Sequence, residues 1–198
     1  MGGKREEKAP VEYPTLDQME EEISRLQYRK RYGRALRGTV YSLAVVAAIA
    51  ILIATLWMPV LQITGASMSP TLVDGQFVVA VKTSGFEPGD ITAFYYNNKI
   101  LVKRVIASSG DWVNISGEGN VYVNGILLEE PYIKEKALGE CNIELPYQVP
   151  DGKVFVMGDD RAVSLDSRTT AVGPVSKEQV LGRVVFRVWP LSVFGGVR

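Results

Sequence analysis

Histidine is absent from this 198-residue chain, and Cys141 is its single cysteine. Without an imidazole the chain cannot form a Ser-His-Asp triad, a Cys-His pair or most kinds of catalytic zinc site. A lone cysteine cannot form an intrachain disulfide, and no second thiol is available to bind a metal with it. Among nucleophilic hydrolases the serine-lysine mechanism stays open, because there a desolvated amine takes the hydroxyl proton.

An excess of charge is also missing, since 22 Lys and Arg residues balance 22 Asp and Glu residues. A net charge of zero gives no electrostatic argument for nucleic acid, and we predict no nucleic-acid partner. The length has room for one modest domain of about 100 to 150 residues together with a tail or anchor.

The segment from Gly38 to Val73 contains no charged residue, and Val40–Leu61 is almost continuously apolar. As a helix, Val40–Leu61 would be about 33 Å long, which is enough to span a bilayer. A buried core helix of this length normally shows a polar stripe, which this segment lacks. A cleavable signal peptide has a shorter apolar stretch of about 7 to 15 residues. The pattern therefore predicts an uncleaved transmembrane anchor at residues 40–61.

Basic residues without any acidic residue among them precede the anchor: Arg25, Arg29, Lys30, Arg31, Arg34 and Arg37. The positive-inside rule then places a charged tail, residues 1–39, in the cytoplasm and residues 62–198 outside the cell membrane. Within the tail, Leu16–Tyr32 is spaced like a solvated helix, although a disordered tail would have a similar composition.

After Gln62 the pattern changes to short β-rich runs separated by turns. Asn124-Gly125 between two apolar runs is a strong hairpin signal. We predict a mainly β, antiparallel and partly closed domain, with residues 129–150 as a polar surface connection. The predicted strands are Gln76–Lys82, Ile91–Tyr96, Ile100–Ala107, Val121–Val123, Ile126–Leu128, Val154–Met157 and Val180–Val188.

Lys103 and Ser67 are the candidates for a serine-lysine pair. On a strand, Lys103 shares a face with Leu101 and Val105, and burial between them would lower its pKa toward that of a useful base. Judged on the strand alone, a lysine at a sheet edge or in an ion pair is the more ordinary interpretation. Ser67 likewise fits an ordinary linker, although Gly65 would let a substrate backbone approach closely.

Four segments follow one another behind the anchor in a fixed order. They are Gly65–Leu72, Pro88–Ile91, Lys103–Ile106 with Gly110-Asp111, and Gly158–Arg168. In this order the chain resembles a bacterial type I signal peptidase (leader peptidase) of the Gram-positive branch. The resemblance implies a membrane-bound serine endopeptidase that removes signal peptides from exported preproteins at the outer face of the cytoplasmic membrane. It implies no metal and no cofactor, and its partners would be signal peptides and the lipid bilayer; the oligomeric state is open.

The same resemblance assigns roles to individual residues. Ser67 would be the nucleophile, with its backbone N–H in the oxyanion hole, Lys103 the general base, and Ser164 the residue that orients the amine. The substrate would bind as an extended strand beside Gln62–Gly65 and the Lys103 strand, in keeping with the family's Ala-x-Ala preference. Substrate-binding residues would be Ile63, Gly65 and Met68, and ion-paired support would come from Arg104, Asp159, Asp166 and Arg168.

Two positions depart from the family pattern, namely Gly65, where some members have a serine, and Asp160, where asparagine is frequent. The first implies that backbone amides or water do more of the oxyanion stabilisation, and the second changes the local charge balance.

Two other interpretations of the sequence remain. One is a serine-lysine protease like the self-cleaving domain of SOS-response repressors, which lacks a membrane anchor. The other is a tethered β domain, or an inactive homologue that binds signal peptides without cutting them.

Overall fold

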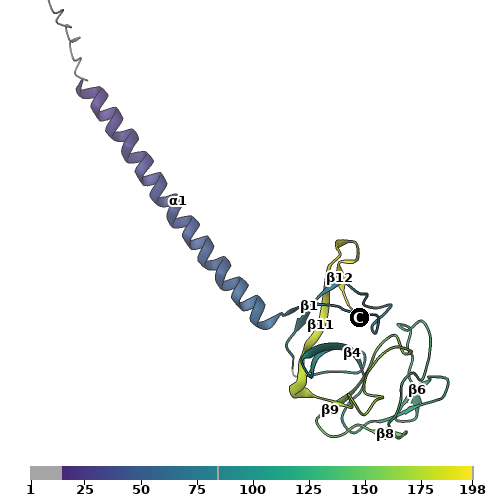
Figure 1. Ribbon diagram of the computed structural model, residues 1–198. Coiled ribbons are helices and arrows are strands. Elements are labelled where there is room, and N and C mark those ends of the chain that lie inside the picture. Colours follow the sequence, from purple (N-terminus) through teal and green to yellow (C-terminus); the bar gives the residue numbers. More distant parts are fainter. Residues whose placement is uncertain (1–14, 84, 198) are drawn as a thin grey trace, which may run out of the picture. The chain divides into compact units, whose positions relative to one another are not determined.

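The computed structural model describes residues 15–83 and 85–197, which divide into a helical unit and a β domain with a boundary at residues 52 and 53. Helix α1 runs without interruption over Leu16–Trp57, so the charged helix and the anchor predicted from sequence are parts of one helix (Figure 1). Its last hydrogen bond joins Met58 N–H to the Ala54 carbonyl at 2.7 Å. Pro59 then ends the helix, since proline lacks an N–H and restricts the residue before it. Extending the helix to Leu61 was therefore wrong.

The apolar half of α1 has the length and composition of a membrane span. An 18-residue window of the helix has a mean hydropathy of 2.4, and none of it is buried against other described residues. The uncharged stretch that ends at Trp57 is about 30 Å long at 1.5 Å per residue, close to the thickness of a hydrocarbon core. In the charged half, Arg25 and Glu21 form an exposed ion pair of 2.7 Å one turn apart.

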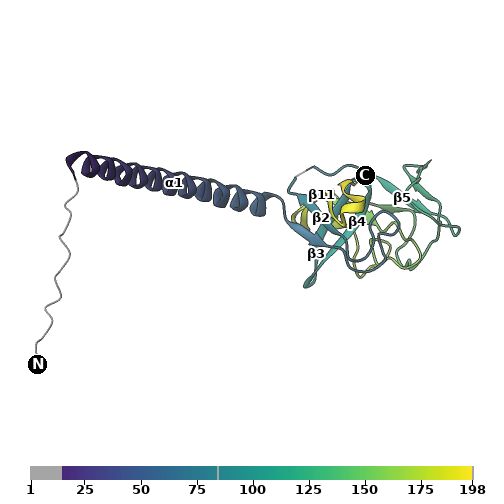
Figure 2. The same ribbon diagram turned by 90° about the horizontal axis from the view of Figure 1, so that it is seen from above.

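The β domain contains two antiparallel sheets. The larger sheet has the strand order β1-β2-β11-β3-β4-β9-β10, with β12 paired to β11, and the smaller sheet has the order β7-β6-β5-β8. In both views the smaller sheet lies at the end of the domain away from β1 and β2 (Figures 1 and 2). The strands of the larger sheet are β1 (Val60–Gln62), β2 (Phe77–Val81), β3 (Ile91–Tyr96), β4 (Lys99–Ala107), β9 (Lys153–Met157), β10 (Val175–Ser176), β11 (Val180–Trp189) and β12 (Gly195–Gly196). Those of the smaller sheet are β5 (Trp112–Ile115), β6 (Val121–Val123), β7 (Ile126–Leu127) and β8 (Tyr147–Gln148).

The prediction of a mainly β, antiparallel domain behind one apolar helix is confirmed. Each of the seven predicted strands is present, with ends within one residue of the expected ones. Asn124 and Gly125 both have positive φ, of 53° and 79°, as a type I′ hairpin turn requires. The sequence did not predict β1, whose first two residues fall within the predicted anchor, or the short strands β5, β8, β10 and β12.

Two features of the packing place the candidate site. First, β4 lies between β3 and β9, so its second half is buried within the larger sheet. Second, Met68 and Leu72 are 2% and 0% exposed and pack with residues of β2 and β3 in one hydrophobic cluster. Burying a side chain of this size stabilises a fold by about 1.5–3 kcal/mol, so this packing holds the segment after β1 firmly against the sheet.

Candidate active site

Ser67 lies in a tight turn that its neighbours hold in place. Gly65 has a φ of 85°, a conformation that glycine adopts readily, and its N–H donates to Asp74 Oδ1 at 2.7 Å. The Leu72 N–H donates to the Met68 carbonyl at 2.8 Å. Between these fixed points Ser67 is half-buried. The serine is thus anchored through the backbone on both sides while its hydroxyl stays reachable.

Lys103 lies in β4 opposite Thr92 of β3, and it is 2% exposed. Its Nζ is 2.6 Å from Ser67 Oγ, a distance at which either group can donate to the other. The two residues are 36 positions apart in sequence. Strand β4 and the turn after β1 therefore bring together the two residues that the sequence put forward as a pair.

Burial lowers the pKa of Lys103 from 10.5 to about 8. The carboxylates of Asp166 and Asp159 act in the opposite direction and the Arg168 guanidinium in the same direction, but desolvation dominates. A change of this size corresponds to about 3 kcal/mol of lost preference for the charged amine. Near pH 8 a large share of the lysine is neutral, which is the form that can accept a proton.

Arg104, the next residue of β4, makes a bidentate ion pair with Asp159, with Nε–Oδ1 at 2.9 Å and Nη2–Oδ2 at 2.7 Å. Its Nη1 donates to the Gly89 carbonyl at 2.8 Å. The Thr71 hydroxyl donates to Asp159 Oδ2 at 2.5 Å. This pair links β4 and the loop after β9 to the segment that carries Ser67.

Asp166 and Arg168 form a second buried pair, with Nε–Oδ1 at 2.8 Å and Nη2–Oδ2 at 2.9 Å. Asp166 Oδ2 also accepts the Gly158 N–H at 2.9 Å. Arg168 Nη1 donates to the carbonyls of Leu138 and Arg161. The four residues expected to form ion-paired support thus lie in two buried pairs beside the lysine.

Ser164 is buried, but its Oγ has no hydrogen-bond partner in the part of the chain that the structure describes. The hydrogen bond that we expected between Ser164 and the Lys103 amine is therefore not formed here. Ser164 Oγ instead lies against Gly158, where a Cβ would collide with it and would lie 2.5 Å from the Ser67 carbonyl oxygen. The Ser164 side chain and the Ser67 carbonyl oxygen leave no room for a side chain at position 158, and the orienting role of Ser164 stays a prediction.

A cavity of about 490 Å³ opens beside Ser67. Ile63 and Met68 line it, whereas Gly65 does not. Its two walls come from the segment at β1 and from the start of β4. The lining residues are Val60–Thr64, Ser67, Met68 and Asn98–Val102.

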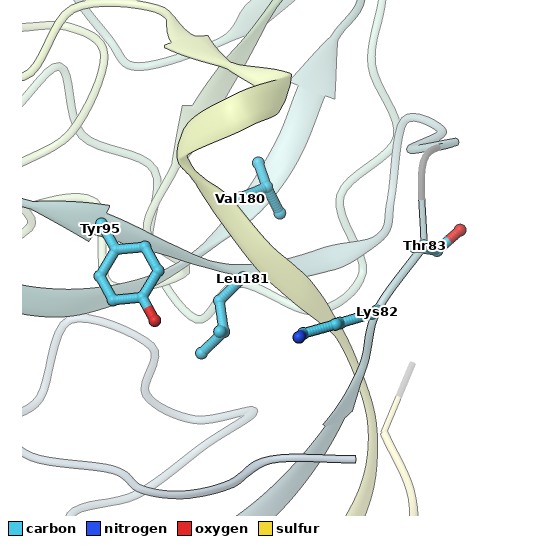
Figure 3. A pocket seen from close by; sticks show the side chains of 5 residues that line it. All are labelled: Lys82, Thr83, Tyr95, Val180 and Leu181. Carbon is cyan, nitrogen blue, oxygen red and sulfur yellow. The ribbon is translucent and has the colours of Figure 1, made fainter. Parts of the chain in front are cut away.

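A second cavity of similar volume lies elsewhere on the larger sheet (Figure 3). In this view the Lys82 amine and the Tyr95 hydroxyl border an open depression next to Leu181. None of its five lining residues belongs to the Ser67 and Lys103 cluster. The cavity beside Ser67 is therefore the candidate site, because Ser67 lines it and has its hydroxyl 2.6 Å from the Lys103 amine.

Three residues beside the site, Glu130, Arg161 and Tyr132, were not predicted from the sequence. Glu130, placed on a surface connection, is buried and ion-paired with Arg161, and Tyr132 lies with its ring 3.9 Å from Arg104 Cζ. Burial and the Glu130 carboxylate raise the pKa of the Tyr132 hydroxyl. One signal could have pointed to Glu130. The segments around the site contain three arginines. Arg104 pairs with Asp159 and Arg168 pairs with Asp166, which leaves Arg161 without a carboxylate, and a buried arginine needs one.

No group of three His, Cys, Asp or Glu side chains within residues 15–83 and 85–197 is arranged to hold a metal ion. Cys141 is half-buried and has a free thiol.

Comparison with known proteins gives a consistent result. Residues 36–189 match the family described as signal peptidase, peptidase S26. Signal peptidase IB of Staphylococcus aureus (strain COL) is 37% identical over 175 aligned residues, covering 78% of this chain and 90% of that protein. Thylakoidal processing peptidase 1 of Arabidopsis thaliana is 39% identical over 148 residues and 66% of this chain, which spans only 42% of that longer protein. A crystal structure of a signal peptidase I from Enterococcus faecalis is 29% identical, covering 50% of this chain and 96% of that one, with a TM-score of 0.41.

Proposed function

Because this chain belongs to the signal peptidase family, peptidase S26, we propose that it cuts signal peptides with a Ser67–Lys103 dyad at the outer face of the cytoplasmic membrane. Family membership makes it a serine-type hydrolase of the bacterial type I, Gram-positive-like kind that removes signal peptides from preproteins. The residues that carry the reaction and the side of the membrane are the finer parts of the proposal.

One observation is the main support for the proposed dyad: a buried lysine amine lies 2.6 Å from a half-buried serine hydroxyl in a chain without histidine. The lowered pKa of Lys103, about 8, makes the neutral amine available. A nucleophile and base within hydrogen-bond distance are the minimum geometry of nucleophilic catalysis.

In the proposed reaction, Ser67 Oγ attacks the scissile carbonyl carbon and its proton passes to the neutral Lys103 Nζ. The protonated amine gives that proton to the leaving nitrogen as the peptide bond breaks, leaving an ester between Ser67 and the signal peptide. Water then attacks the ester, its proton passes to Lys103, and Ser67 recovers a proton as the acid is released. The Ser67 backbone N–H would stabilise the oxyanion in both steps.

The cavity supports an extended substrate. Strand β1 is at the edge of its sheet and lines one wall, so a peptide can pair with it, while β4 lines the other. Ile63 and Met68 would then limit the side chains beside the cleaved bond to small ones, as an Ala-x-Ala preference requires. Gly65 lies outside the lining, and its role would be to let the peptide backbone pass closely.

The domain organisation is part of the proposal: residues 1–39 in the cytoplasm, an anchor within residues 40–61 and a catalytic domain outside. The basic residues before the apolar half of α1 support this orientation. In protoplasts treated with protease, the β domain should be digested and the N-terminal tail spared. Protection of the β domain would refute the orientation.

The dyad is tested with full-length protein in detergent micelles and a preprotein that has alanine at the first and third positions before the cleaved bond. Wild type should release the mature protein, whereas Ser67→Ala and Lys103→Met should not. Ser69→Ala and Lys177→Met, a neighbouring serine and an exposed lysine, are the matched controls and should cleave normally. A wild type that binds the preprotein without cutting it would identify an inactive homologue.

A further inference from the structure

A buried ion pair joins the connection, residues 129–150, to the site loop, which we define as residues 158–168. The Glu130 carboxylate accepts hydrogen bonds from both terminal nitrogens of Arg161, from Nη1 at 3.1 Å and from Nη2 at a shorter distance. Both side chains are fully buried. Desolvating two charges is costly, so such a pair is retained where its geometry compensates for that cost or where it serves a purpose other than stability.

Arg161 links its ion pair with Glu130 to the backbone around Ser67. Its Nε donates to the Gly158 carbonyl at 3.1 Å. Gly158 packs so closely on the Ser67 carbonyl oxygen that a Cβ would lie 2.5 Å from it, and the Asp160 N–H donates to that same oxygen at 3.1 Å. The position of the serine backbone therefore depends on the part of the site loop that Arg161 holds.

Tyr132 extends the contact to the lysine strand. Its hydroxyl donates to Glu130 Oε1 at 3.1 Å, and its ring lies over the Arg104 guanidinium with 3.9 Å between Cζ and the ring centroid. Arg104 is in turn paired with Asp159 of the site loop. Glu130 thus contacts the site loop at Arg161, and Tyr132 is connected to it through Arg104, the partner of Asp159.

We propose that Glu130 is a positioning residue for signal-peptide cleavage, supported by Tyr132, and that the start of the connection is a brace that holds the site loop against Ser67. Glu130 does not line the cavity beside Ser67, so it acts through Arg161 rather than on the substrate. The inference rests on the proposed Ser67–Lys103 dyad. A displacement of about 1 Å at a nucleophile can reduce a rate by about 100-fold, so a brace outside the cavity can matter for turnover.

The first test is Glu130→Gln in the full-length protein, assayed in detergent micelles with a fluorogenic peptide carrying alanine at the first and third positions before the cleaved bond. This change keeps the shape of the side chain and removes its charge, leaving Arg161 unpaired. We expect kcat to fall by about 10- to 100-fold while KM stays within about 3-fold. The exposed neighbour Glu129 provides the matched control, and Glu129→Gln should stay within about 2-fold of wild type.

A double variant separates positioning from stability. Glu130→Gln combined with Arg161→Gln removes the unpaired buried cation, so the melting temperature should return toward that of wild type. Because Arg161→Gln also removes the Nε that donates to the Gly158 carbonyl, kcat should stay low. A purely structural role predicts instead that kcat recovers together with the melting temperature.

Tyr132→Phe is the mildest variant, because it keeps the ring over Arg104 and removes one hydrogen bond to Glu130. We expect kcat to fall by about 2- to 5-fold at unchanged KM.

If Glu130→Gln does not fold, the double variant and Tyr132→Phe decide whether Glu130 is a positioning residue. Wild-type kcat in folded Glu130→Gln, full recovery of kcat in the double variant, or a rise in KM alone would overturn the positioning role. Cleavage by Lys103→Met, or none by wild type, would instead refute the proposed dyad.

Discussion

Lys103 and Arg104 are neighbours on β4 and both are 2% exposed, yet only the arginine side chain is paired with a carboxylate. Arg104 is held by both oxygens of Asp159 and by the Gly89 carbonyl. Across the described residues no ion pair includes Lys103, whose amine lies 2.6 Å from the Ser67 hydroxyl. A guanidinium stays charged in proteins and needs a carboxylate when buried, whereas an amine can lose its proton.

The difference shows how one strand can serve both for support and for chemistry. The carboxylates of Asp159 and Asp166 would favour a charged Lys103, but each is already paired with an arginine. Their attraction for the lysine is therefore offset in part, and desolvation decides its pKa. We expect the two basic residues to respond very differently to substitution.

The largest effect is expected for Lys103→Met compared with Lys103→Arg. Both should reduce cleavage by about 100- to 10,000-fold, the contribution of a positioned general base. Their stabilities should differ: Met fits the apolar surroundings, while Arg introduces a permanent buried charge without a carboxylate. Melting temperatures at neutral pH should place Lys103→Met at or above wild type and Lys103→Arg well below it. Equal melting temperatures would contradict the view that the lysine charge is disfavoured.

Arg104→Met should have the next largest effect, on stability first. It leaves the Asp159 carboxylate buried and unpaired, which costs about 3–5 kcal/mol. Arg183 of β11 provides a matched control, because its pair with Asp90 is half exposed and has a distance of 3.4 Å. Arg183→Met should cost less than about 1 kcal/mol. Thermal unfolding of both variants tests this, and a similar loss in the two would mean that burial of the ion pair is unimportant.

The pH dependence should show that Lys103 loses its proton near pH 8. Below that pH, kcat/KM should fall about tenfold per pH unit, with an apparent pKa near 8. The chain has no histidine, so no imidazole produces this limb. A limb near pH 4–5 would indicate a carboxylate, and one above pH 10 an unperturbed lysine.

Stability should change with a definite sign as the pH rises from about 8 to about 10.5. The folded pKa of Lys103, about 8, is below the unfolded value of 10.5, so the unfolded chain binds the proton more tightly. The group therefore destabilises the fold by about 3 kcal/mol below pH 8, and this penalty fades as the pH rises to about 10.5. The stability difference between wild type and Lys103→Met should shrink across that window. A difference that stays constant from pH 7 to pH 10 would contradict the assigned pKa.

Ser164→Ala should have the smallest effect. Removing a buried hydroxyl without a partner should leave stability unchanged or raise it by about 1 kcal/mol. If the hydroxyl orients Lys103 during turnover, kcat should still fall by a few fold, with the fold intact. Wild-type kinetics in the folded variant would show that Ser164 has no orienting role.

Much of the fold can be predicted from the sequence. The apolar half of α1 shows as an uncharged run, and the strands show as short β-branched runs between turns, because both patterns reflect local geometry and burial. The end of α1 was misplaced because Val60 and Leu61 are as apolar as the anchor, and hydropathy cannot separate a strand from a span. Pro59 was the better guide, since it acts on the backbone itself.

By itself, then, the sequence determined the apolar N-terminal helix, the β class and the candidates Ser67 and Lys103, since composition, local periodicity and the absence of histidine can be read without knowing how the chain packs. The tertiary structure decided that the two side chains lie 2.6 Å apart and that Glu130, on a polar connection, is buried against Arg161. The same glutamate would be an ordinary surface residue on another fold. Distances and burial are properties of packed, sequence-distant segments, and a lysine becomes a base only where such packing removes its water.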